Sequence, residues 1–85
     1  MIEVVKYWAP WCQPCKMLTP TIDGLRGKVN GVTFTNVNVD EQSEVASAAG
    51  VRNIPLVIIK KNGVVVDRIS GVNPESVYLN KIQAA

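Results

Sequence analysis

The chain has no histidine, only two cysteines, few aromatic residues and little excess charge. Two cysteines without histidine cannot close a tetrahedral zinc site, which takes four protein ligands, so we expect no metal. The net charge of +2 has no basic run to concentrate it, which argues against nucleic acid as a partner. The apolar runs are far shorter than the roughly 20 residues of a membrane span. We expect neither nucleic acid nor membrane as a partner.

What is present indicates one small globular domain. With 85 residues, 47% of them hydrophobic and 19% charged, the chain has room for a single core. We therefore expect one domain over residues 1–85, present as a monomer. No basic and then apolar leader precedes the first apolar run, so we expect a cytoplasmic protein. In such a reducing compartment a close cysteine pair is more often catalytic or metal-binding than structural.

Hydrophobic periodicity predicts alternating strands and helices. Strands are indicated at residues 2–8, 32–39 and 56–59, and a hairpin turn at Asn62-Gly63 leads into a further strand at 64–66. Leu18, Ile22 and Leu25 share one helix face between Pro14 and a stop at Gly27, with Pro20 expected to kink the helix. A second helix is predicted after an N-cap at Asp40, and its apolar stripe before Gly50 consists of Val45, Ala48 and Ala49. A third helix is predicted after an N-cap at Asn73, and its apolar stripe consists of Tyr78, Leu79, Ile82 and Ala85.

The order β-α-β-α-β-β-α determines the expected architecture. A right-handed helical crossover makes the first two strands parallel, and the hairpin makes the last two antiparallel. We predict an α/β fold with a mixed four-stranded sheet and helices on both faces.

The two cysteines lie where the first strand gives way to the first helix, in the run Cys12-Gln13-Pro14-Cys15. A helix N-terminus carries unpaired N–H groups and partial positive charge, which stabilise a thiolate on Cys12, and Lys16 adds a nearby cation. We expect Cys12 to be an exposed nucleophile. Cys15, one turn further in, is expected to be covered and to resolve the mixed disulfide.

Two other interpretations of the pair are open. A structural disulfide closing so short a loop would remove little chain entropy and would stabilise weakly. A metal or iron–sulfur site would need ligands from a second chain. Both are less favoured than thiol–disulfide exchange.

The run from Trp8 to Lys16 resembles the W-A-x-W-C-G-P-C-K signature of the thioredoxin family. Pro20 matches the proline of the family's active-site helix, and Asn38-Val39-Asp40 resembles the end of its central strand. Ile54-Pro55 resembles its cis-proline site, while Lys61-Asn62-Gly63 and Gly71 match its last hairpin. The resemblance covers nearly the whole chain and implies the thioredoxin fold.

The resemblance also implies an activity and a surface. The activity is protein-disulfide reduction without a bound cofactor, with electrons from NADPH through a flavin-containing, thioredoxin reductase-like enzyme. The partners are disulfide-bearing client proteins, among which ribonucleotide reductase is a candidate by analogy. A cis bond before Pro55 would leave the Ile54 backbone free to pair with an extended substrate. The expected substrate-binding residues are Trp11, Gln13, Pro14, Ile54, Pro55 and Gly71.

The sequence departs from the family pattern in several places. The chain begins at what the family treats as its second strand. Lys6 stands where the family has a buried Asp, and Asn36 aligns with that residue's usual lysine partner. Lys6 either extends to solvent or lies near Cys15 and favours its thiolate, which would raise the reduction potential. Gln13 replaces a glycine and Leu56 a common threonine.

Two alternative functions remain. A glutaredoxin-like, glutathione-coupled redoxin is disfavoured because the cysteine pair lacks the usual tyrosine and the paired glycines after the last hairpin are absent. A non-catalytic accessory subunit or binding module would have no need of both cysteines. The leading hypothesis is a thiol–disulfide oxidoreductase, with Lys6 and Lys16 modulating the dithiol.

Overall fold

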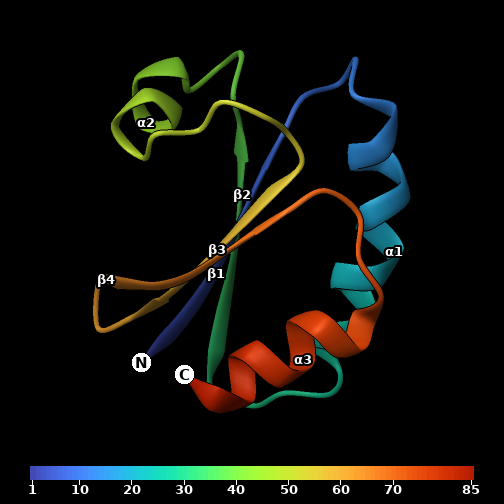
Figure 1. The fold of residues 1–85 in the computed structure, drawn as a ribbon, viewed down its shortest axis with the longest axis vertical. Helices are drawn as coiled ribbons and strands as arrows, with labels where there is room; N and C mark the ends of the chain where they lie inside the picture. The colour runs from blue at the N-terminus through green and yellow to red at the C-terminus, as the bar shows by residue number, and fades with distance from the viewer.

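A computed structural model describes all residues from Met1 to Ala85 (Figure 1). The elements follow the predicted order of strands and helices. They are β1 (Ile2–Trp8), α1 (Gln13–Arg26), β2 (Val32–Asn38), α2 (Ser43–Ala48), β3 (Leu56–Lys61), β4 (Val64–Ser70) and α3 (Glu75–Ala84). No helix is long and apolar enough to cross a bilayer.

The four strands form one mixed sheet in the order β2-β1-β3-β4. β1 pairs in parallel with β2 and antiparallel with β3, and β3 pairs antiparallel with β4. The predicted parallel crossover and the predicted hairpin are both confirmed. Asn62 and Gly63 adopt positive φ values of 53° and 83°, as a tight hairpin turn requires.

Helices cover both faces of the sheet, as predicted. Figure 1 shows α1 and α3 together on one side and α2 on the other. The α1–α3 side holds the larger core, in which Leu18, Ile22 and Leu25 of α1 meet Tyr78 and Ile82 of α3. The α2 side holds a smaller core. β3 lies between them, and its first four residues are fully covered because side chains on both of its faces are packed.

The helix that carries the cysteines follows its predicted pattern. Its three predicted core positions are each no more than 1% exposed, and the helix ends at Arg26 with Gly27 as its C-cap. It continues as one helix through Pro20. One apolar face therefore holds α1 against the sheet and fixes the position of its N-terminus.

The predicted starts of the other two helices are wrong. Asp40 does not cap α2, because Asn38 Oδ1 accepts hydrogen bonds from the backbone N–H groups of residues 40 and 41 and keeps this segment in a turn. The helix begins only at Ser43, so its orientation changes: Ala46 is buried, whereas Val45 is 46% exposed. Asn73 likewise does not cap α3, because its side-chain amide donates to the carbonyl of Ser70.

Candidate active site

Cys12 and Cys15 form a disulfide at the N-terminus of α1, with their Cα atoms 5.3 Å apart. Cys12 is the N-cap residue, in extended conformation, and its Sγ accepts a hydrogen bond from the backbone N–H of Cys15 at 3.2 Å. The sulfur thus takes the role that the side-chain oxygen of a Ser or Asp N-cap usually has, which is to accept a hydrogen bond from an N–H group of the first helical turn. The helix therefore directs one of its unpaired donors at the sulfur of Cys12, where a thiolate would carry its charge.

The expected contrast between an exposed Cys12 and a covered Cys15 is wrong for the disulfide form. Cys12 is 4% exposed and Cys15 is 2% exposed. Both sulfurs belong to a small cluster with Ala9, which is fully buried, and Trp8, Val39 and Ile54 pack against it. The strand end and the loop before Pro55 thus cover both sides of the pair.

The peptide bond between Ile54 and Pro55 is cis, as the resemblance implies. Pro55 is buried, and Ile54 packs against the cysteine cluster, so this loop lies beside the disulfide. The carbonyl of Pro55 accepts a hydrogen bond from the N–H of Gly71 at 3.0 Å, which brings the two predicted surface positions together. Gly71 has a φ of 77°, a conformation that glycine adopts without strain.

Trp11, Gln13, Pro14 and Lys16 are all exposed around the cysteines. The Trp11 side chain is 69% exposed, and its indole Nε1 donates a hydrogen bond of 2.8 Å to Asp40 Oδ2. This bond orients the exposed indole. Asp40 therefore contacts the site, whereas the sequence predicts it to cap a helix.

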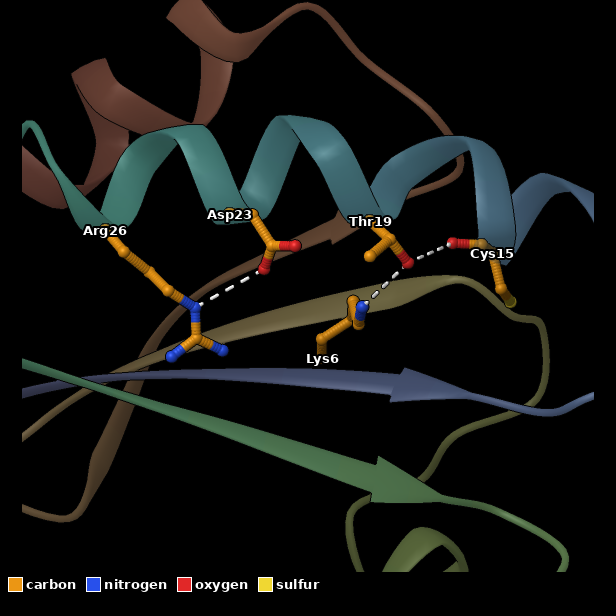
Figure 2. A network of polar contacts seen from close by, with 5 residues as sticks. All are labelled: Lys6, Cys15, Thr19, Asp23 and Arg26. Carbon is orange, nitrogen blue, oxygen red and sulfur yellow. Dashed lines mark hydrogen bonds and ion pairs between the residues drawn. The ribbon is translucent and has the colours of Figure 1, made fainter.

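Lys6 does not extend to solvent, so that interpretation is wrong. It is 7% exposed and its Nζ donates to Thr19 Oγ1 at 3.2 Å (Figure 2). Burial lowers the pKa of Lys6 from its usual 10.5, the nearby Asp23 carboxylate opposes this shift, and the Arg26 guanidinium adds to it. Asn36 is its register partner on β2, the neighbouring-strand position that the resemblance implies.

The sequence did not predict a role at the site for three residues that position it. Thr19 receives Lys6, Asp40 holds Trp11, and the phenol of Tyr78 donates to the carbonyl of Gly71 at 3.0 Å. Thr19 lies four residues after Cys15, so the two residues share one face of the helix. This spacing could have indicated from the sequence that Thr19 lies near Cys15. Nothing in the sequence pattern indicates the pairing of Trp11 with Asp40.

A family model described as "Thioredoxin" matches residues 1–84. The chain is 40% identical over 74 residues to thioredoxin 1 of Nostoc sp., covering 86% of this chain and 69% of the relative. It is 39% identical over 82 residues to thioredoxin 2 of Chlorobaculum tepidum, covering 95% and 75%.

Solved structures agree with these relatives. Thioredoxin of Fasciola hepatica superposes with a TM-score of 0.90 at 34% identity, over 98% of this chain and 79% of that one. A thioredoxin of Nicotiana alata gives 0.91 at 36% identity, over 98% and 71%. A redox-active cysteine pair on this fold defines a thiol–disulfide oxidoreductase that reduces protein disulfides. The chain belongs to the thioredoxin family.

Proposed function

We propose that Cys12 is the nucleophile of this reductase and Cys15 its resolving thiol. The Cys12 thiolate attacks one sulfur of a client disulfide, forming a mixed disulfide and releasing the other client sulfur as a thiolate. Cys15, as a thiolate, then attacks the Cys12 sulfur. This step forms the Cys12–Cys15 disulfide and releases the second client sulfur, so the client gains two electrons and the protein loses two.

The observation that supports this order is the hydrogen bond from the Cys15 N–H to Cys12 Sγ at 3.2 Å. It places Cys12, and not Cys15, at the end of α1 where backbone N–H groups are unpaired. A thiolate is stabilised at such a position and is also the better leaving group when the pair is re-reduced.

We place the client along the loop that ends in the cis peptide bond. The Ile54 backbone lies beside the dithiol and makes none of the turn or loop backbone hydrogen bonds, so it is available to an extended client segment. The exposed side chains of Trp11, Gln13 and Pro14 would contact the client side chains. The partly exposed Gly71 and the buried Pro55 would shape the surface beside them.

The remaining assignments are also proposals. We expect a monomer of one domain in the cytoplasm, where a pool of reductant keeps thiols reduced. Its partners would be disulfide-bearing clients, with ribonucleotide reductase as one candidate, and a thioredoxin reductase-like flavoenzyme would supply electrons from NADPH. Relatives named thioredoxin support this route over glutathione.

The roles can be tested with insulin as the protein-disulfide substrate. Cys15→Ser should accumulate a covalent mixed disulfide with the substrate, detected by non-reducing mass spectrometry, whereas Cys12→Ser should form none. Turnover should depend on NADPH and a thioredoxin reductase and should not be supported by glutathione with glutathione reductase. Full turnover by Cys12→Ser would contradict the proposed order, and turnover with glutathione would favour the glutaredoxin-like alternative.

A further inference from the structure

Lys6 is the one charged residue among the 20 buried residues of the protein. It points from β1 toward the first turns of α1, as Figure 2 shows, and forms no ion pair. A buried cation without a direct carboxylate partner is costly, so its place in a small core calls for a physical reason.

The side chain is linked to the resolving cysteine by two hydrogen bonds. Lys6 Nζ donates to Thr19 Oγ1 at 3.2 Å, and Thr19 Oγ1 donates to the carbonyl oxygen of Cys15 at 3.2 Å. The ammonium is therefore fixed under the helix turn that carries Cys15. The Cys12 sulfur, in contrast, faces the N-terminal end of the helix.

The other groups around Lys6 neutralise its charge only in part. On α1, Asp23 and Arg26 are its charged neighbours, and they pair with each other at 3.5 Å. Across the sheet, its register partners are Asn36 on β2 and Val57 on β3, which carry no charge. Part of the positive charge of Lys6 is therefore left to act on a thiolate at Cys15, if the two groups lie close enough.

We propose that Lys6 is a positioning residue for Cys15, whose resolving thiolate it stabilises through its buried ammonium. The inference rests on the proposed roles of the two cysteines and adds a determinant of the second step alone. A neighbouring opposite charge favours the ionised form of an acid and lowers its pKa by about one to three units. We take about one unit, the lower end of that range, because the hydrogen bonds lead from Lys6 to the Cys15 carbonyl and not to its sulfur.

This effect has a signature that depends on pH. Removing the cation should raise the midpoint pH of the Cys15 step by about one unit, which leaves about tenfold less thiolate below the midpoint. A more basic thiolate is a stronger nucleophile, by about threefold per unit. The Cys15 step should therefore be about threefold slower in Lys6→Met at low pH and about threefold faster above both midpoints.

The two steps can be separated with 5,5′-dithiobis(2-nitrobenzoate) and the reduced protein in stopped flow. Attack by Cys12 releases one thionitrobenzoate and leaves the other bound to Cys12 through a disulfide. Attack by Cys15 on that sulfur closes the protein disulfide and releases the second. Each release is a separate absorbance phase, recorded across pH.

We expect Lys6→Met to change the second phase as described and to leave the first phase within about twofold of wild type. Lys6→Arg should keep the wild-type midpoint, because it keeps the charge. The matched control is Lys61→Met, which removes an exposed lysine paired in register with Ile2, at the far end of β1 from the cysteines. Thr19→Val, which removes the link, should give an intermediate midpoint.

Several outcomes would overturn the proposal. An unchanged midpoint in Lys6→Met, or equal slowing of both phases at every pH, would show that Lys6 has only a structural role. A midpoint in Lys6→Arg equal to that of Lys6→Met would exclude the charge as the cause. Failure of the proposed cysteine roles looks different, because Cys12→Ser would then show a first phase at the wild-type rate, whereas a covered Cys15 should react much more slowly.

Discussion

Replacing Lys6 with methionine should stabilise the folded protein. Removing a buried charge relieves a desolvation penalty of several kcal/mol, and methionine fills nearly the same space. The loss of the hydrogen bond to Thr19 and of the attraction to Asp23 offsets part of this gain. We expect a net increase of about 1–2 kcal/mol in the free energy of unfolding at pH 7. For a domain of this size that corresponds to a rise in Tm of roughly 5–15 °C.

The size of this increase should depend on pH. The pKa of Lys6 is lowered in the folded state, so between that value and the unfolded value near 10.5 the unfolded chain binds more protons. The free energy of unfolding of the wild-type protein therefore rises with pH in this window, because of Lys6. The advantage of Lys6→Met should be full below the lowered pKa of Lys6 and should shrink as the pH rises from there towards 10.5.

Urea unfolding of the oxidised proteins, followed by circular dichroism from pH 6 to 10.5, measures both effects. The difference between wild type and Lys6→Met is the relevant quantity. Tyr7, whose pKa is raised by burial, also affects alkaline stability but does so in both proteins. Lys61→Met should change stability by less than about 0.5 kcal/mol. Destabilisation by Lys6→Met at pH 7, or an advantage that grows with pH, would refute the reasoning.

Three further substitutions test contacts that hold the site and its supports. Tyr78→Phe removes the hydrogen bond to the Gly71 carbonyl and should cost about 1 kcal/mol in urea unfolding; no loss would mean that water replaces the phenol. Arg68→Met removes two hydrogen bonds to carbonyls at the end of α2 and should cost about 1–2 kcal/mol, with faster amide exchange in α2 and not in α1. Gly24→Ala should gain up to about 1 kcal/mol from helix propensity, because the only close atom that the new Cβ would meet, Glu75 Oε2 at 2.7 Å, is the end of a flexible side chain that can move away. A gain that appears only when Glu75→Ala is also present would show that this side chain cannot move.

Periodicity alone predicts most of the fold. The strand at residues 2–8, the α1 face of Leu18, Ile22 and Leu25, and the covered β3 all appear as expected, because each buries a continuous apolar stripe. Helix starts were predicted less well. Asn38 and Asn73 use their side chains to bond turn backbone instead of helix N–H groups, and the sequence does not reveal which backbone group a short polar side chain will meet.

The dithiol itself was the most predictable part of the site, and its surroundings the least. The spacing of Cys12 and Cys15 is local, so the helix N-terminus follows from neighbouring residues. The pairing of Trp11 with Asp40 joins residues 29 positions apart. The burial of Cys12 also needs the loop at Ile54, which only the folded chain brings there.

The two effects expected of Lys6 have opposite signs, and this opposition is what distinguishes a functional buried charge from a tolerated one. If the lysine were only a packing element, its replacement by methionine would change stability and leave the pH dependence of the Cys15 step unchanged. If the substitution damaged the fold, stability and both reaction phases would fall together. A more stable protein with a shifted second phase is expected only when the cation is retained at a cost in folding free energy because it acts on Cys15.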